Sequence, residues 1–402
     1  MSEPRRAAAA FLAAAGVMLV IIAGGTLPAP LYPLWQDAYG FGSITITEVF
    51  AAYACGTLAG LLVLGRASDV AGRRTMLAAG LAVTELSTVV FLVAAGTAWL
   101  YVGRVLSGLA VGIATGAAAA ALSELEPHGN PRRAAAYVTG ASMGGLGLGS
   151  LVAGVLAQYA PHPTRLVFAV YLAAVAVTAV VAAALVPETV QARGSLDLRP
   201  RFGTPPGALG PFLAAGAGSF AGFAFQGLFT SLAASFLADD LGRRNHALAG
   251  SVVFVLFMGA AASQLALRDV PARTSMLAGL ALLVVGLGLV ELALVRHSLA
   301  AFVVAAAIGG FGSGLAFMGS LATVNRVAPD ARRGEVLSAF YTLAYAGLII
   351  PVIGIGVLTE HVTTVQATTG FAAALLIAMG GAGLLAARRV PGGRDEPRAY
   401  TP

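Results

Sequence analysis

The residues best suited to chemistry are a few charges set among long apolar runs. The stretch GRASDVAGRRTML, residues 65–77, places Asp69, Arg73 and Arg74 between two such runs, and Glu85 and Arg104 lie inside runs. The chain as a whole is 58% hydrophobic and only 10% charged. Because a charge within a membrane is energetically costly, these residues are candidates for a functional site. The chemistry they suggest is ion pairing, proton transfer or anion binding.

The elements that must position these charges are membrane-spanning helices. A helix needs about 20 apolar residues to cross the hydrocarbon core of a bilayer, and the sequence has twelve apolar runs of about that length. We therefore expect an all-α membrane protein with little chain left for a water-soluble domain. The predicted spans are residues 7–31, 44–64, 76–96, 98–122, 134–157, 164–187, 208–237, 247–267, 275–295, 298–321, 335–358 and 364–387.

The distribution of arginine predicts the orientation of the chain. All 24 basic residues are arginine, and with the N-terminus in the cytoplasm each flanks a cytoplasmic span end except Arg104, Arg165, Arg243, Arg244 and Arg296. The positive-inside rule then places both termini in the cytoplasm. The net charge of +6 is in this interpretation a topology signal, which argues against nucleic-acid binding. The Ala, Gly and Arg bias indicates a GC-rich bacterial genome, and hence a bacterial inner (plasma) membrane protein.

An internal repeat divides the chain into two halves. Residues 69–77 and 269–277 share Asp, Val, Arg, Met and Leu at equivalent positions, and the pair Arg132-Arg133 recurs 200 positions later as Arg332-Arg333. Parallel halves of this kind are typical of alternating-access transporters, in which substrate binds between the halves. The predicted domains are an N-terminal six-helix bundle (1–187), a central cytoplasmic loop (188–206), a C-terminal six-helix bundle (207–390) and a cytoplasmic tail (391–402).

Two motifs give the chain a resemblance to the major facilitator superfamily (MFS) over nearly its whole length. The loop after the second span fits the family pattern G-x-x-x-D-x-x-G-R-R, and the fourth span fits R-x-x-x-G-x-x-x-G. The resemblance implies the MFS fold, with twelve transmembrane helices in two pseudo-symmetric six-helix bundles. The matching residues are Gly65, Asp69, Gly72, Arg73 and Arg74 in the loop, and Arg104, Gly108 and Gly112 in the span.

Two weaker matches resemble the twelve-span drug:proton antiporter branch of that family. Gly24, Pro30 and Pro33 follow its first-span signature, and the fifth span matches its G-x-x-x-G-P-x-x-G-G motif at three positions. The branch implies proton-coupled efflux of hydrophobic compounds, but Gly145 replaces the Pro and Leu148 replaces a Gly, which leaves the transport direction open. We expect the motif glycines to allow close helix packing, namely Gly108, Gly112, Gly140, Gly144 and Gly149.

The resemblance also assigns a role to the charged loop. In the family the Asp is thought to meet the start of the eleventh span, where a helix N-terminus favours an anion, and the Arg to pair with an acid that ends the fourth span. Glu124 and Glu126 are the two candidate acids here. We hypothesise a cytoplasmic latch, while topology alone remains the alternative for the arginines. The second half carries Ala272 and Thr274 in place of Gly72 and Arg74, so the latch should be asymmetric. Its proposed members are Gly65, Asp69, Gly72, Arg73, Arg74 and either Glu124 or Glu126.

The charges inside spans have two interpretations each. Arg104 binds an anionic group or tunes a carboxylate during proton transfer; alternatively it snorkels to the outer interface. Glu85 is a possible partner of Arg104 and a possible proton carrier; alternatively it forms a structural pair. Thr45 and Glu48 have the spacing of a helix capping box.

The expected cavity is largely apolar, which suits a hydrophobic or amphipathic substrate better than a sugar or amino acid. For each aromatic residue, ordinary helix packing is the alternative. The candidate lining residues are Thr26, Thr115, Phe223, Gln226, Phe254, Phe317, Tyr341 and Tyr345.

An enzymatic function is not indicated. The sequence presents no nucleophile paired with a base, no phosphate-binding loop and no His/Cys metal cluster, so we expect no cofactor and no metal. The expected partners are a small-molecule substrate, protons and the lipid bilayer, with the protein a monomer. Two alternatives remain: an importer or facilitator of a small metabolite, and a transport-inactive scaffold or sensor on the same fold.

Overall fold

The computed structural model describes residues 3–64, 67–190, 199, 202–240 and 242–390, and within these ranges the chain is helical without strands. It contains twelve helices that are long and apolar enough to cross a membrane. The prediction of an all-α protein with twelve spans is confirmed. Gly65, the tail 391–402 and most of residues 191–201 lie outside the described residues.

The twelve long helices follow the predicted runs closely. Those of the first half are α1 (Glu3–Ala23), α3 (Ser43–Leu64), α5 (Arg73–Leu92), α6 (Thr97–Glu124), α7 (Pro131–Tyr159) and α8 (Pro163–Leu185). Those of the second half are α9 (Leu209–Ser235), α10 (His246–Ala266), α11 (Ala272–Val295), α12 (Leu299–Val327), α13 (Arg333–Thr359) and α14 (Thr364–Arg389). Short elements connect them: η1 (Ala29–Leu31), α2 (Tyr32–Tyr39), α4 (Ala67–Ala71), η2 (Phe236–Asp240) and η3 (Asp330–Arg332).

The first span differs from the prediction because its helix breaks. The predicted run of residues 7–31 is helical only to Ala23, and the chain continues as a turn into η1 and α2. Gly24 and Gly25 lie at the break, where a Cβ would lie 2.6 Å and 2.5 Å from the hydroxyls of Tyr171 and Tyr53. Pro28 and Pro30 follow, and proline lacks the N–H that a continuing helix needs.

The capping box predicted at Thr45 and Glu48 was wrong. Helix α3 begins two residues earlier, at Ser43, so Glu48 lies beyond the first turn. Its Oε2 accepts a hydrogen bond from the hydroxyl of Tyr101 at 2.5 Å.

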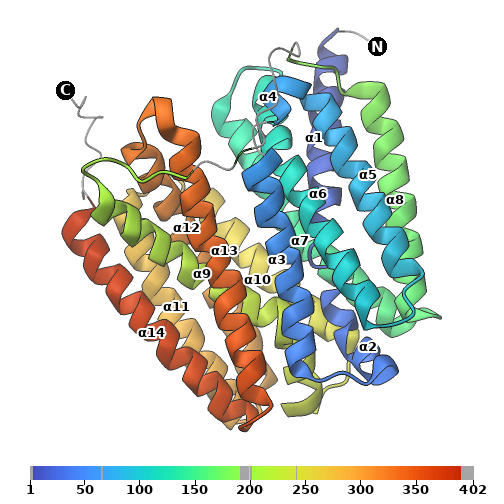
Figure 1. The fold of residues 1–402 in the computed structure, drawn as a ribbon, viewed down its shortest axis with the longest axis vertical. Coiled ribbons are helices and arrows are strands. Elements are labelled where there is room, and N and C mark those ends of the chain that lie inside the picture. The colour runs from blue at the N-terminus through green and yellow to red at the C-terminus, as the bar shows by residue number, and fades with distance from the viewer. Residues whose placement is uncertain (1–2, 65–66, 191–198, 200–201, 241, 391–402) are drawn as a thin grey trace.

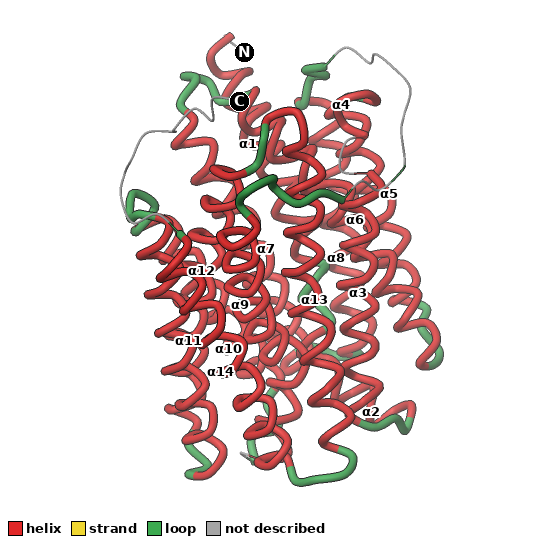
Figure 2. The backbone as a smooth tube through the Cα atoms, turned by 60° about the vertical axis from the view of Figure 1, so that its left-hand side comes forward, coloured by secondary structure: helices red, strands yellow, loops and turns green. Residues whose placement is uncertain are grey.

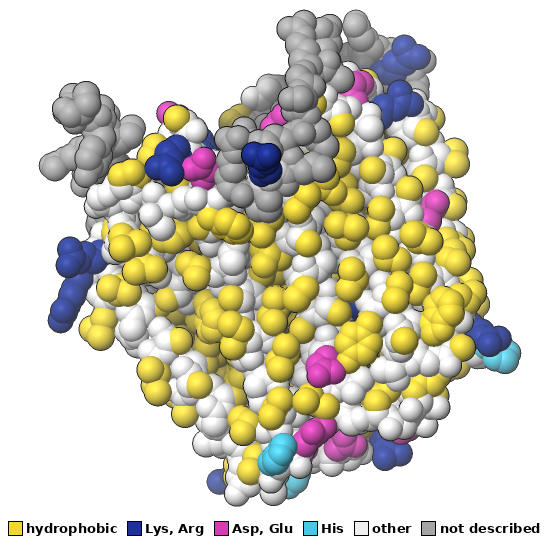
Figure 3. Space-filling view, viewed as in Figure 1, with side chains coloured by type: hydrophobic (Ala, Val, Ile, Leu, Met, Phe, Trp, Pro, Cys, Tyr) yellow, Lys and Arg dark blue, Asp and Glu magenta, His cyan; other side chains and the backbone are white. Residues whose placement is uncertain are grey.

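The two halves lie side by side, with both chain ends at one end of the molecule and α2 at the other (Figures 1 and 2). We call these the termini end and the far end. The surface between them carries mainly hydrophobic side chains, while charged side chains gather toward the two ends (Figure 3). This pattern fits a protein whose middle faces lipid.

Contacts between the halves are concentrated toward the far end. Helix α7 packs on α10, and α3 packs on α13. At the first contact a Cβ on Gly154 would lie 2.4 Å from the His246 carbonyl oxygen, and a Cβ on Gly250 would lie 2.3 Å from the Ser150 carbonyl oxygen. At the second, Gly356 packs on Thr47. These residues all belong to the far-end parts of their helices, and in Figure 1 the two groups of ribbons diverge toward the termini end.

Candidate functional site

The charged loop at the termini end is built around a glycine. Gly72 separates the short helix α4 from α5 and has φ +96°, a conformation that residues with a Cβ rarely adopt. A Cβ at this position would also lie 2.3 Å from Oε2 of Glu188. The backbone conformation therefore requires glycine, whereas the Glu188 carboxylate could move away from a Cβ. The turn places Arg73 as the first residue of α5, directly after α4.

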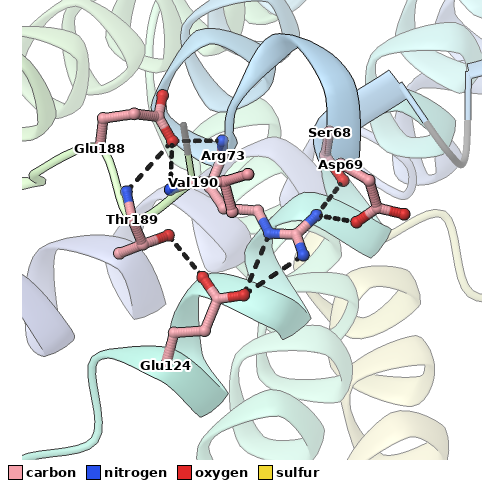
Figure 4. Close-up of polar contacts among 7 residues, drawn as sticks. All are labelled: Ser68, Asp69, Arg73, Glu124, Glu188, Thr189 and Val190. Atoms are coloured by element: carbon pink, nitrogen blue, oxygen red, sulfur yellow. Dashed lines mark hydrogen bonds and ion pairs between the residues drawn. The ribbon is translucent and has the colours of Figure 1, made fainter. Parts of the chain in front are cut away.

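Arg73 joins α4 to the end of α6 (Figure 4). Its Nη1 donates to Asp69 Oδ1 at 2.5 Å and to Ser68 Oγ at 2.7 Å. Its Nε and Nη2 donate to Glu124 Oε1 at 3.3 Å and 3.2 Å. One guanidinium thus holds two carboxylates on different helices, and Glu124 is the acid at the end of the fourth span that pairs with it.

Glu188, which the sequence analysis did not single out, completes this network. Its Oε1 accepts from the backbone N–H of Arg73 at 2.7 Å, of Thr189 at 3.1 Å and of Val190 at 3.3 Å. The Thr189 hydroxyl donates to Glu124 Oε2. An acidic residue directly after the sixth span was the available signal, since the first N–H groups of a helix attract an anion. We call Ser68, Asp69, Arg73, Glu124, Glu188 and Thr189 the Arg73 network.

Glu126 is not part of the Arg73 network. Its Oε2 accepts from the backbone N–H groups of Asn130 at 2.6 Å and His128 at 2.8 Å, and Arg133 lies 3.4 Å from its Oε1. The hydrogen bond from Asn130 is the main cause that holds the pKa of the Glu126 carboxyl below its usual value, with His128 and Arg133 acting in the same direction against burial. Glu126 therefore organises the loop before α7.

Asp69 does not reach across to α13 in this arrangement. Its partner is Arg73, and 60% of its side chain is exposed. The start of α13 has ion pairs of its own, Arg332 with Glu335 at 2.9 Å and Arg333 with Asp330 at 3.0 Å. Among the described residues, no hydrogen bond or ion pair links Asp69 to the second half.

The two halves share one arginine contact and differ in the rest. Arg74 Nη2 donates to the carbonyl of Ala183 near the end of α8 at 2.7 Å, and Arg273 Nη2 donates to the carbonyl of Ala387 near the end of α14 at 2.6 Å. A cation at a helix C-terminus stabilises the unpaired carbonyl groups there. The repeat aligns Arg273 with Arg73, but its contact is that of Arg74, so the Arg73 network has no counterpart there within the described chain.

Arg104 is fully buried at the break of the first span. Its Nη1 donates to the Gly25 carbonyl at 2.7 Å, and its guanidinium carbon lies 4.9 Å, 5.5 Å and 5.7 Å from the ring centres of Tyr53, Phe50 and Tyr32. Among the described residues, no hydrogen-bond acceptor meets Nε or Nη2. The snorkelling alternative was wrong, because the side chain is fully buried, where the Gly25 carbonyl and the three rings stabilise its charge.

Glu85 is not the partner of Arg104. It lines a groove between α5 and α8 together with Arg74. Ser87, two residues further along α5, donates to the Gly103 carbonyl of α6 at 2.8 Å. Since two residues turn a helix by about 200°, Glu85 lies on the opposite side of α5 from α6 and its Arg104.

The motif glycines fall into two groups. A Cβ on Gly108 or Gly112 would lie 2.1 Å or 2.5 Å from a carbonyl oxygen of α3, and a Cβ on Gly149 would lie 2.2 Å from the Ala23 carbonyl oxygen. Among the described residues, no atom beyond the adjoining residues of α7 lies within 4 Å of a Cβ placed on Gly140 or Gly144, so the expectation of close packing was wrong for these two in this arrangement. Gly145 faces α1 instead, where its Cβ would lie 2.5 Å from the Leu19 carbonyl oxygen.

Four candidate lining residues of the second half belong to one aromatic cluster. Phe223 stacks on Phe317 with ring centres 5.6 Å apart and meets Tyr345 edge-on at 5.4 Å. Tyr341 lies next to this group, 5.5 Å from Phe340, which is itself 6.2 Å from Phe317. Gln226 Nε2 donates to Ser313 Oγ at 2.9 Å. We call Phe223, Phe317, Phe340, Tyr341 and Tyr345 the aromatic cluster.

The remaining candidates are occupied by packing. Thr26 donates to the Leu146 carbonyl at 2.5 Å, Thr115 donates to the Val111 carbonyl of its own helix at 2.6 Å, and Phe254 packs on Gly147. Phe50 lies between Arg104 and the aromatic cluster. Its ring faces the Arg104 guanidinium. It also packs in a buried group with Leu348 and Val352, and Phe223 and Tyr345 of the aromatic cluster pack against that group.

Comparisons with known proteins identify the family. The Major Facilitator Superfamily family model matches residues 13–269. Among solved structures, the chain is similar to the human organic anion transporter MFSD10 (TETRAN), with 17% identity, a TM-score of 0.67, and coverage of 95% of this chain and 100% of that one. It is also similar to a bacterial homolog of the human lysosomal transporter Spinster in an inward-facing and unoccupied conformation, with 15% identity, a TM-score of 0.74, and coverage of 97% and 98%.

These two similarities concern the fold. A search of curated protein sequences found no match. Because the family model matches more than half of the chain, the chain belongs to the Major Facilitator Superfamily and is a multi-pass membrane transporter of small molecules rather than an enzyme.

Proposed function

We propose that this transporter exports hydrophobic or amphipathic small molecules in exchange for protons across a bacterial inner membrane, as a monomer and by alternating access. The observation that carries the substrate class is the aromatic cluster, in which Phe223 contacts both Phe317 and Tyr345. Gln226 and Ser313, one turn along the helices of Phe223 and Phe317, are hydrogen-bonded to each other. Stacked rings bind apolar bodies well and offer few fixed hydrogen bonds to a sugar or an amino acid.

The arrangement of the halves supports alternating access. The arginine bias favours a cytoplasmic termini end, and the contacts between the halves lie toward the far end. The described state is then an inward-facing one. In the outward-facing state the bundles 1–187 and 207–390 would separate at the far end and meet at the termini end, on either side of the loop 188–206.

The Arg73 network is in this proposal one side of a cytoplasmic latch. Arg73 and Glu124 hold Asp69 beside the α5 start, and Asp69 is exposed enough to turn toward α13 when the termini end closes. Gly72 and Arg74 position the loop, and Glu188 anchors the first turn of α5.

Arg104, which lies at the break in the first span, is proposed to couple substrate transport to proton transport. Its Nε and Nη2, which have no hydrogen-bond partner within the described chain, also favour a second candidate function, the transport of organic anions. MFSD10, a protein of the same fold, is described as an organic anion transporter.

Dye transport by cells that express the protein tests both candidates. The cells are loaded with a cationic, a neutral and an anionic fluorescent dye of similar size, with and without a protonophore, and compared with cells expressing Phe223→Ala or Arg104→Ala. Lower accumulation of the hydrophobic dyes, abolished by the protonophore and by either substitution, supports the proposal. Selective export of the anionic dye favours organic anions. Gradient-independent uptake of a metabolite indicates an importer or facilitator, and transport of no compound with a well-folded protein indicates a scaffold or sensor.

A further inference from the structure

A groove lies between α5 and α8 on the outer side of the first half. Its volume is about 270 Å³, close to the lower end of the roughly 300–1,000 Å³ range of small-molecule sites. Helix α5 lines it with a single stripe from Arg74 to Glu85. On the other side it is lined by Ala179, Ala182 and Ala183 of α8 and by Val186, the residue after α8. Five of its ten lining residues are alanine, and these short side chains leave the space between the helices open.

The groove faces the membrane. Both helices are candidate membrane spans, and their main packing partners, apart from each other, are α1, α6 and α7 of the same half. Ala78, Ala82 and Ala183 are exposed, and the surface over these helices is hydrophobic, with basic side chains toward the termini end (Figure 3). A molecule dissolved in the bilayer therefore reaches the groove without entering the space between the halves.

Glu85 is the one acidic side chain that lines this groove. Within the described part of the chain it has no hydrogen bond or ion pair, and the recorded hydrogen bond of Arg74 goes to the Ala183 carbonyl. Helical side chains lean toward the N-terminus of their helix, which directs Glu85 into the groove. An unpaired carboxylate in apolar surroundings is costly unless it is neutralised or meets a cation.

We propose that the groove binds a lipophilic organic cation taken directly from the bilayer, with Glu85 as its counter-ion and the alanine-lined walls around its apolar body. Arg74, the basic residue that lines the same groove, lies eleven residues away, about 16 Å along the helix. This separation makes its repulsion of a cation at Glu85 weaker than the attraction of the adjacent carboxylate. This second site goes beyond the proposed function, since it lies outside the region between the halves and its occupancy requires no transport.

Equilibrium dialysis of the purified protein in lipid nanodiscs tests the site. The probes are tetraphenylphosphonium and tetraphenylborate, which have nearly the same shape and opposite charge. In Glu85→Gln we expect at least a tenfold loss of affinity for tetraphenylphosphonium at one site and unchanged binding of tetraphenylborate. The matched control is Glu291→Gln, which removes a carboxylate on α11 that already accepts a hydrogen bond from Thr369 at 3.0 Å, and it should leave both affinities unchanged.

A second variant separates the groove from the charge. Ala82→Phe fills the groove while Glu85 stays in place, and it should weaken tetraphenylphosphonium binding as well. Wild-type affinity in Glu85→Gln or in Ala82→Phe overturns the proposal, as does an equal loss in Glu291→Gln. Loss of all tetraphenylphosphonium binding in Phe223→Ala would place the probe between the halves and also overturn it. Because dialysis measures binding alone, a protein that exports no dye can still show the Glu85-dependent site.

Discussion

The far-end contact between α7 and α10 makes the strongest prediction, through Gly250→Val. A Cβ at Gly250 would lie 2.3 Å from the Ser150 carbonyl oxygen and 3.2 Å from the Gly154 Cα. Non-bonded heavy atoms are comfortable at about 3.5 Å, so the helices must separate by about 1 Å at this point, and valine adds two further methyl groups. Both neighbours of the new side chain are backbone atoms, which cannot rotate away.

The expected result is a shift from the described state to one that is open at the far end. Overpacking of a tight contact costs about 1–3 kcal/mol, which changes the ratio of the two states by roughly 5-fold to 150-fold, since 1.4 kcal/mol corresponds to a factor of ten. Packed interfaces have discrete alternatives rather than continuous ones. A penalty of this size at the far end therefore favours the opposite gate position over a slightly loosened copy of the same state.

Distances between spin labels measure that shift. Labels on cysteines introduced at Tyr159 and Val362 report the far end, after the exposed Cys55 has been replaced by serine. Gly250→Val should lengthen this distance, and Gly288→Val is the control because no atom lies within 4 Å of a Cβ at Gly288. An unchanged distance distribution in a folded Gly250→Val protein would refute the argument that this glycine contact holds the halves together.

Three further predictions concern the charged residues. Glu188→Gln should lower the free energy of unfolding by about 0.3–1 kcal/mol, the usual contribution of an anion at a helix N-terminus. Glu188→Ala should lower it further, because the Arg73 N–H then loses its acceptor. Chemical unfolding in detergent measures both changes. The pKa of Glu126 is held below its ordinary 4.5. Its contribution to stability is therefore complete above that pH and disappears as the pH falls through the lowered pKa. In Glu126→Gln the melting temperature should lose this part of its decrease at acidic pH. Arg104→Lys should reduce dye export nearly as much as Arg104→Ala. The reason is that the lysine ammonium is not planar and cannot contact the Gly25 carbonyl and three rings together as the guanidinium does. Arg165→Lys is the control, and a wild-type initial rate of export in Arg104→Lys would contradict the assignment.

The sequence predicted the helices because the membrane imposes a simple rule on them. Twelve apolar runs of bilayer length became twelve helices. The pairing of Arg73 with an acid at the end of α6 was expected from the resemblance to the MFS loop motif, which left Glu124 and Glu126 as alternatives. The sequence could not show which of the two neighbouring acids, Glu124 or Glu126, pairs with Arg73. Glu124 is the last residue of α6 and pairs with Arg73. Glu126 lies two residues beyond the helix end and accepts from backbone N–H groups of the loop before α7, a difference that depends on where the helix ends rather than on residue type.

Contacts between distant segments were out of reach of such patterns. Glu188 lies 115 positions from Arg73 and meets it because α8 ends beside the start of α5. At the break of the first span, Gly24 and Gly25 leave room for the hydroxyls of Tyr171 and Tyr53, which belong to other helices. Gly140 and Gly144 carry the same motif as Gly149 but face no neighbour, because close packing depends on which face of α7 meets another helix.

The geometry of Asp69 explains how the proposed latch can both hold and release. In the described state Asp69 is an exposed partner of Arg73, and an exposed ion pair contributes about 0.2–1 kcal/mol. At the start of α13 the same carboxylate would gain about 0.3–1 kcal/mol from the helix dipole. These two values nearly cancel, and Arg73 keeps Glu124 as a partner in either position. The movement of Asp69 from Arg73 to the start of α13 therefore leaves no buried charge unpaired. The relative populations of the two states are then determined by the larger contacts, which are the glycine interface at the far end and the substrate between the halves.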